Sequence, residues 1–181
     1  MIRLIAAIDS CRGLATDRGI PWRLPGDSVY FREKTGKGVI VMGRTTYLEF
    51  AAPLGDRENY VLTHATNALR SGFVTVPRLD DVLERFPDED VWVIGGATVY
   101  ALAIDLADEL LLTQVHGDFG CTKFFPPYDD FALVEFSAEH SEIDVSYRFE
   151  RWTRRTTAMP NPGEAGVAKT TQSASGTTAP T

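Results

Sequence analysis

The fold is decided by the stretch VWVIGGATVYALAIDL at residues 91–106, in which an apolar run turns into a helical pattern across two glycines. Residues 91–94 form a continuous apolar run, which is typical of a central strand covered on both faces. Residues 98–106 then continue with the pattern of a helix. A strand that passes through a tight glycine turn into a helix indicates an α/β domain.

Apolar runs and helical patterns alternate on both sides of this unit, and no internal repeat is present. Pro25 suits the first turn of a helix, whose residues Val29, Tyr30 and Phe31 we expect to face the core. The last strands alternate polar and apolar residues, as an antiparallel edge does. The predicted elements are strands at residues 4–8, 39–42, 60–62, 73–76, 110–116, 132–137 and 145–152 and helices at residues 25–34, 45–50 and 80–85.

The composition fits one ordinary globular domain, because 44% of the 181 residues are hydrophobic and 24% are charged. With 25 acidic and 18 basic residues, the net charge of -7 disfavours binding to a nucleic-acid backbone, which needs clustered Lys and Arg. No apolar run approaches the roughly 18 residues that cross a bilayer, and residues 1–8 lack the basic start and cleavage site of a signal peptide. We therefore expect a cytoplasmic protein that binds neither nucleic acid nor membrane.

The two cysteines, Cys11 and Cys121, fit no metal-binding spacing, and the three histidines are dispersed. We predict free thiols and no metal site.

The composition changes after residue 155. Residues 156–181 are mainly Thr, Ala, Pro, Gly and Ser, with no aromatic residue and one valine. Such a segment cannot bury enough apolar surface to offset the entropy of ordering it. We predict one domain at residues 1–155 and a disordered tail at residues 156–181.

Two strand-to-helix junctions are candidate sites, because ligands of open α/β sheets bind at the carboxyl ends of strands. Residues 42–46, MGRTT, present a glycine, a guanidinium and two hydroxyls, and residues 94–98, IGGAT, repeat the pattern without the arginine. Both junctions could hold phosphate. Neither is a GxGxxG motif or a P-loop, so the alternative that these glycines only serve tight turns stays open.

A third candidate is the stretch PWRLPGD at residues 21–27, which ends in a lone carboxylate in the first turn of the predicted helix. Asp27 has two interpretations. The first is an N-terminal carboxylate favoured by the helix dipole, and the spacing alone favours it. The second is a partly buried acid whose pKa is raised by desolvation and which handles a proton or binds a cationic ring.

Taken together, these segments resemble the dihydrofolate reductase family over residues 1 to about 153. The matching residues are LIAA at 4–7, IPWRLPGD at 20–27, Phe31, VMGRTT at 41–46, Arg57, WVIGG at 92–96, Val99, Tyr100, Thr113, Phe125 and Pro126. The resemblance implies a mixed eight-stranded, mostly parallel sheet flanked by four helices. It also implies hydride transfer from NADPH to C6 of 7,8-dihydrofolate with protonation of N5, which gives 5,6,7,8-tetrahydrofolate for one-carbon metabolism.

The resemblance assigns catalysis to Asp27, Trp22 and Thr113. Asp27 would be the only ionisable side chain at the pterin end and would bind the pterin amino group and N3–H. Thr113 would be hydrogen-bonded beside it, and Trp22 would hold a water. N5 lies too far from this acid for direct transfer in the family's geometry, so the water is the expected proton donor and Asp27 the electrostatic partner.

The remaining ligand contacts also follow from the resemblance. Arg57 would bind the glutamate α-carboxylate as a bidentate fork, and the Gly95-Gly96 peptide would be cis. The substrate-binding residues would be Ile5, Asp27, Phe31, Leu54, Arg57, Ile94 and Thr113. The NADPH-binding residues would be Ala7, Leu14, Gly43, Arg44, Thr45, Thr46, Thr63, His64, Gly95, Gly96, Ala97, Thr98, Val99 and Tyr100.

The chain departs from the family pattern in the loops beside the site. Ala15 stands where many bacterial members have glycine, and Cys121-Thr122 stands where they have a Gly-Asp pair that holds the mobile loop closed. We therefore expect loop closure to be weaker or to depend on different contacts, with an effect on turnover or product release. Ser28 and Ile20 change the pocket where antifolates bind, so an altered trimethoprim sensitivity of either sign is a further expectation.

The main prediction is a monomeric enzyme that binds dihydrofolate and antifolate inhibitors. Several alternatives to it stay open. One is an antifolate-insensitive variant of the same enzyme. Another is a reductase of riboflavin synthesis with the same fold, against which residues 22–27 and Arg57 argue. The last is a non-catalytic binding protein, against which the intact Asp27, Thr113 and Trp22 argue.

Overall fold

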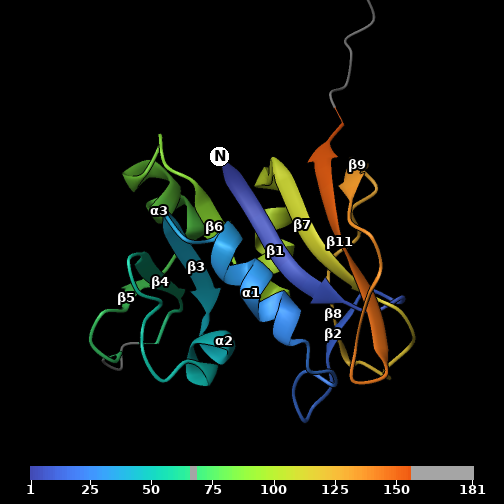
Figure 1. Cartoon of the computed structure of the whole chain (residues 1–181). Helices are drawn as coiled ribbons and strands as arrows, with labels where there is room; N and C mark the ends of the chain where they lie inside the picture. The colour runs from blue at the N-terminus through green and yellow to red at the C-terminus, as the bar shows by residue number, and fades with distance from the viewer. Residues whose placement is uncertain (66–68, 156–181) are drawn as a thin grey trace, which may run out of the picture.

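The computed structural model describes residues 1–65 and 69–155, so the predicted tail at residues 156–181 lies outside the described residues. Its centre is a mixed sheet with the strand order β10-β11-β7-β1-β6-β3-β4-β5, and β9 pairs with β11 beside this path (Figure 1). A small second sheet pairs β2 with β8. The strands are β1 Ile2–Ile8, β2 Gly13–Ala15, β3 Val39–Gly43, β4 Glu58–Leu62, β5 Val74–Val76, β6 Val91–Val93, β7 Glu109–Val115, β8 Lys123–Phe124, β9 Phe131–Phe136, β10 His140–Glu142 and β11 Val145–Arg154.

The strands from β7 to β5 along this path are all parallel to their neighbours, whereas β9, β10 and β11 pair antiparallel. The predicted fold class is therefore confirmed, with β10 as an additional strand on β11. The parallel strands end at one edge of the sheet, where ligand sites of this architecture form.

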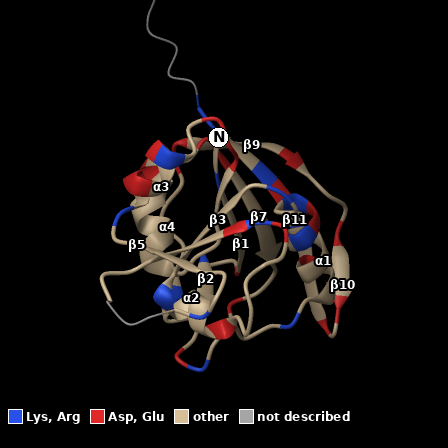
Figure 2. Cartoon of the chain, turned by 90° about the vertical axis from the view of Figure 1, so that its left-hand side faces the viewer, with Lys and Arg blue, Asp and Glu red and all other residues tan. Residues whose placement is uncertain are grey.

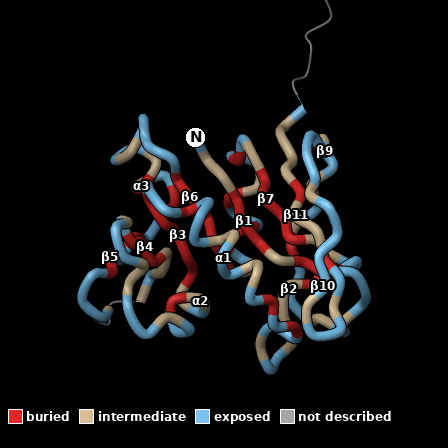
Figure 3. The backbone as a smooth tube through the Cα atoms, in the orientation of Figure 1, coloured by how far each residue is buried: buried red, intermediate tan, exposed pale blue. Residues whose placement is uncertain are grey.

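The helices cover both faces of this sheet. They are α1 Pro25–Lys34, α2 Arg44–Glu49, α3 Leu79–Arg85 and α4 Ala97–Ala103, which continues as a short 3₁₀ turn. Side chains alternate along β1, so Leu4 and Ile8 pack with residues of α3 and α4 while Ile5 packs with residues of α1 and α2. Figure 3 shows the buried residues concentrated in the central strands between these layers. The core thus fixes where each strand end and each helix start lies.

Some local predictions were wrong. Val29 is 45% exposed, and Tyr30 and Phe31 are the residues by which α1 packs on the core. The helix predicted at residues 98–106, in contrast, is confirmed, with its last turn, Ile104–Leu106, in the 3₁₀ form. The short strands β2, β8 and β10 were not predicted, because they carry no apolar run.

Charges of both signs are interspersed along the chain (Figure 2). Arg151 of β11, for example, pairs with Glu109 of β7 at 3.0 Å and with Glu135 of β9 at 2.9 Å. Within residues 1–65 and 69–155, no helix combines the length and the apolar character needed to cross a membrane.

Candidate active site

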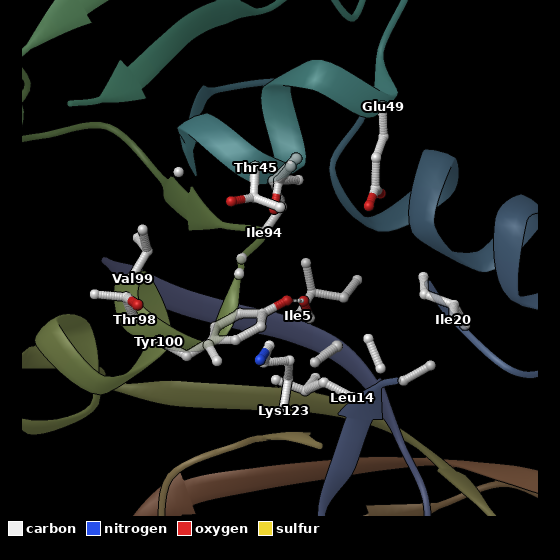
Figure 4. A pocket seen from close by; sticks show the side chains of 18 of the residues that line it. Ile5, Leu14, Ile20, Thr45, Glu49, Ile94, Thr98, Val99, Tyr100 and Lys123 are labelled. Atoms are coloured by element: carbon white, nitrogen blue, oxygen red, sulfur yellow. Dashed lines mark hydrogen bonds between the residues drawn. The ribbon is translucent and has the colours of Figure 1, made fainter. Parts of the chain in front are cut away.

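A cavity of about 1420 Å³ opens at the carboxyl ends of the central strands. Its wall combines the end of β1, the β3–α2 and β6–α4 junctions and the inner face of α1. Figure 4 shows Ile5, Leu14, Ile94 and Tyr100 grouped around it. A pocket for one drug-sized molecule measures roughly 300 to 1,000 Å³. This cavity is therefore large enough for two ligands to meet.

The two glycine-bearing junctions pack against each other in the cavity wall. Gly43 N donates to the Gly95 carbonyl at 2.6 Å, and a Cβ on Gly43 would lie 2.9 Å from Val99 Cγ2. Gly95 has a φ of 116°, and its peptide bond to Gly96 is cis, as the resemblance implied. The Tyr100 hydroxyl donates to the Ile5 carbonyl at 2.6 Å and so joins α4 to β1. The close approach of Val99 therefore accounts for Gly43, and the positive φ accounts for Gly95.

The β3–α2 junction presents an unsatisfied cation. In the part of the chain that the structure describes, Arg44 Nη1 is buried and has no hydrogen-bond partner. Thr45, Thr46, Thr63 and His64 line the same cavity. A buried guanidinium nitrogen without a partner is costly unless an anion binds it. The residues present here fit the phosphate groups of a nucleotide.

Asp27 lies in the first turn of α1, half-buried at the cavity wall. The Thr113 hydroxyl donates to its Oδ1 at 2.5 Å, and Thr113 is in place because it pairs with Ala7 in the parallel β1–β7 ladder. Burial raises the pKa of Asp27 above its ordinary value, against the opposing effect of the Thr113 hydrogen bond, and the charge of Glu142 raises it further. This environment favours the interpretation of Asp27 as a partly buried functional acid.

Comparisons with known proteins agree with this geometry. The family model described as dihydrofolate reductase matches residues 1–154. A dihydrofolate reductase of Bacillus subtilis is 37% identical over 145 residues, which cover 80% of this chain and 86% of that protein. The chain belongs to the dihydrofolate reductase family. A type A13 dihydrofolate reductase of Escherichia coli is 31% identical over 156 residues, with 85% of this chain and 94% of that protein covered.

Among solved structures, a dihydrofolate reductase from Enterococcus faecalis complexed with NADP(H) has a TM-score of 0.78 and 25% identity, and the match covers 86% of this chain and 97% of that one. As a dihydrofolate reductase, the chain is an oxidoreductase that reduces dihydrofolate with NADPH. The relatives named here are all dihydrofolate reductases, and none is a reductase of riboflavin synthesis.

The structure brings most residues that the dihydrofolate reductase resemblance singled out to this one cavity. All the predicted NADPH-binding residues line it, and so do Ile5, Trp22, Asp27, Phe31 and Ile94. Thr113 reaches the site through its hydrogen bond to Asp27.

Leu54 and Arg57 are not part of the cavity wall. Leu54 packs against the cluster that contains Ile5 and Ile94. Arg57 is held at the carboxyl end of α1, where its Nη1 donates to Thr35 Oγ1 at 2.7 Å and its Nε donates to the Gly55 carbonyl at 3.0 Å. Burial lowers the pKa of Arg57.

Several charged residues at the site were missed. Arg32, Glu49 and Lys123 line the cavity, and Figure 4 shows Glu49 on α2 and Lys123 on the β8 side. Arg32 lies one helical turn after Ser28, a residue of the predicted antifolate pocket. That spacing could have predicted that Arg32 also lines the cavity. Lys123 gave no local signal, because it reaches the cavity through the pairing of β8 with β2.

Thr122 joins the loop before β8 to the end of β2 and the loop that follows it. Thr122 N donates to the Ala15 carbonyl at 2.9 Å, and Thr122 Oγ1 donates to Asp17 Oδ1 at 2.9 Å. Cys11 and Cys121 are free thiols, as predicted. Burial, followed by the charge of Asp9, raises the pKa of Cys121 to about 11, so this thiol stays protonated near neutral pH.

Proposed function

We propose that dihydrofolate binds with its pterin ring against Asp27 and that NADPH binds along the wall built by the two glycine junctions. The observation that carries this assignment is the half-buried Asp27–Thr113 pair, which opens on the same cavity as both junctions. Bound NADPH supplies the hydride. Asp27 accepts hydrogen bonds from the pterin amino group and N3–H, and its negative charge favours a protonated N5.

Trp22 is assigned to the proton path. It lines the cavity with Asp27 and would hold the water that delivers the proton to N5. Hydride transfer requires that Asp27 and N5 together hold one proton, and the raised pKa of Asp27 lets them hold it to higher pH, so the rate of the hydride step falls as pH climbs through the apparent pKa of this pair. A flat pH profile for the hydride step would contradict this role.

The outer part of the substrate is assigned to the residues around the carboxyl end of α1. Phe31 and Leu54 would pack against its rings, together with Ile5 and Ile94. Arg57 would bind the α-carboxylate of the glutamate part of dihydrofolate. Two of its nitrogens already donate to Thr35 and Gly55, so a bidentate fork requires Nη1 to exchange its bond to Thr35 for one to the carboxylate.

The test is oxidation of NADPH in the presence of dihydrofolate by the wild-type protein and the Asp27→Asn variant. We expect turnover by the wild type and a loss of about 10²- to 10⁴-fold in kcat for the variant near neutral pH. Asp88→Asn, at an exposed position, is the matched control. A wild-type protein that binds NADPH but leaves dihydrofolate untouched would instead support the non-catalytic alternative.

We further propose that residues 1–155 act as a cytoplasmic monomer and that antifolate inhibitors compete with dihydrofolate for this cavity. Every residue that lines the cavity lies within residues 1–155, which supports a self-sufficient unit. Truncation after Arg155 should leave kcat unchanged and give the elution volume of a monomer. A trimethoprim titration decides between a sensitive enzyme and the antifolate-insensitive alternative.

A further inference from the structure

A second carboxylate, Glu142, contacts the helix turn that carries Asp27. Glu142 is the last residue of β10, and both of its carboxylate oxygens accept a hydrogen bond from Gly26 N, at 3.1 and 3.2 Å. Pro25 has no N–H, so Gly26 supplies the first N–H of α1. The N-cap residue Leu24 provides no side-chain cap. An acidic group from a distant strand therefore caps this helix, where its charge is also favoured by the helix dipole.

Gly26 is required for this contact. A Cβ at position 26 would lie 2.7 Å from Glu142 Oε1 and would also collide with the Tyr147 hydroxyl. Tyr147 is 1% exposed, and its pKa is raised to about 12 by burial and then by its hydrogen bond with Glu142. One packed contact thus joins the hairpin of β10 and β11 to α1. It consists of Glu142, Tyr147 and Gly26, and we call it the hairpin clamp.

We propose that Glu142 is a positioning residue of the reaction, which holds the first turn of α1 through Gly26 N–H and places a second negative charge beside the Asp27 carboxylate. The inference rests on the proposed role of Asp27. The clamp holds the backbone one residue before Asp27, and Thr113 holds the Asp27 side chain from β7. Together the two contacts fix where the acid lies relative to the cavity.

The charge of Glu142 also acts on the protonation of Asp27. After burial, Glu142 is the group that raises the pKa of Asp27, because two carboxylates close together disfavour double ionisation. The other titratable groups coupled to Asp27 are the phenols of Tyr30 on its own helix, Tyr100 on α4 and Tyr147 on β11, and burial raises the pKa of each, so they are neutral near pH 7. The other charged side chains in the cavity wall are Arg23 before α1, Arg32 on α1, Arg44 and Glu49 on α2, Arg78 and Asp80 at the start of α3, and Lys123 on β8.

Two substitutions separate the charge from the cap. Glu142→Gln keeps a carbonyl oxygen that can accept from Gly26 N–H but removes the charge. Glu142→Ala removes both. Glu139→Gln is the matched control, because Glu139 directly precedes β10 and pairs with the exposed His116 at 3.2 Å, and among the described residues no hydrogen bond or ion pair joins it to α1.

The experiment measures the pH dependence of the hydride step in single-turnover reactions with NADPH and dihydrofolate. For Glu142→Gln we expect the apparent pKa of the profile to fall by a few tenths of a unit, with KM for dihydrofolate within about twofold of wild type. For Glu142→Ala we expect the same fall and a reduction of the plateau rate by about three- to tenfold. Glu139→Gln should leave the profile unchanged. A Glu142→Gln profile that overlays the wild type, or moves to higher pH, overturns the inference.

A second readout does not depend on activity. The carbon NMR signal of the Asp27 side-chain carboxyl, followed as a function of pH in the protein without ligands, should give a lower pKa in Glu142→Gln than in wild type. If Asp27→Asn keeps the wild-type rate profile while this NMR shift is present, the proposed role of Asp27 fails and the coupling stands. If Asp27→Asn abolishes activity and the NMR titration is unchanged in Glu142→Gln, the inference about Glu142 fails alone.

Discussion

Asp27 is placed where the needs of folding and of catalysis oppose each other. Burial raises its pKa because the charged form loses hydration, and the Thr113 hydrogen bond recovers only part of that loss. The same scarcity of water lets the carboxylate act strongly on a cationic ring bound next to it. An acid in this position is therefore expected to cost stability in the free protein.

The stability of Asp27→Asn tests this cost. The folded-state pKa is raised above the unfolded value of about 3.9, so the penalty is absent below that pH and develops as pH rises through the folded-state pKa. The substitution should increase the free energy of unfolding by about 0.5 to 2 kcal/mol at pH 7, since the Asn carbonyl oxygen still accepts from Thr113. Urea denaturation at pH 7 and near pH 4 measures it. A stabilisation of equal size at both pH values would contradict the assignment to charge burial.

Arg44 is the second residue whose environment points to a ligand. Its buried Nη1 lacks a partner within the described residues, so we expect the preference for NADPH over NADH to depend on Arg44. Replacing it by leucine should raise KM for NADPH by about 10- to 100-fold, because hydrogen bonds to charged groups contribute about 1.5 to 3 kcal/mol. KM for NADH, which lacks the extra phosphate, is the internal control. Equal losses with both cofactors would assign Arg44 a structural role instead.

At the scale of elements, Asp9 shows how one side chain joins the loops beside the site. Asp9 follows β1, is 1% exposed and accepts from Cys11 N, Gly13 N and Phe119 N at 2.8, 2.6 and 3.2 Å. Burial alone would raise its pKa, but these backbone hydrogen bonds together hold it below the ordinary value. The carboxylate therefore fastens the β1–β2 loop to the loop that precedes β8.

Asp9→Asn should destabilise the protein by about 1 to 3 kcal/mol at pH 7, because its amide nitrogen cannot accept from Phe119 N. Since the folded-state pKa is lowered, the stabilisation by Asp9 is present above the unfolded value and is lost as pH falls through the folded value. Thermal unfolding at pH 7 and pH 3 should therefore give a larger difference from wild type at pH 7 than at pH 3. The exposed Asp88→Asn variant should match wild type at both.

The sequence predicted the elements whose formation is local. The apolar runs of β1, β3, β6 and β7 are long enough to identify buried strands, and the residues at the carboxyl ends of β1, β3 and β6 line the cavity as expected. The strands β2, β8 and β10 could not be predicted, because their pairing depends on partners and not on their own composition. Glu142 was missed for the same reason, since it lies 116 residues from Gly26.

At the scale of the whole molecule, the net charge of -7 contrasts with the anionic ligands of the family. Cations are therefore needed locally, and the cavity wall supplies them as Arg23, Arg32, Arg44, Arg78 and Lys123. Asp27 and Glu49 line the same cavity. The two ligands are consequently expected to bind independently placed groups on one wall, the cofactor at the junctions and the pterin at α1.

Ligand-induced stabilisation tests whether the cofactor binds at the junctions and the pterin at α1. A ligand at about 100 times its Kd stabilises the folded state by about 2.7 kcal/mol, which corresponds to an increase in Tm of roughly 5 to 10 °C for a domain of this size. NADPH and dihydrofolate should each raise the Tm of the wild type. Asp27→Asn should lose most of the shift with dihydrofolate and keep the shift with NADPH, whereas Arg44→Leu should show the reverse. Loss of both shifts in either variant would mean that the residue supports the shape of the whole cavity, and the assignment of the cofactor to the junctions and of the pterin to α1 would be wrong.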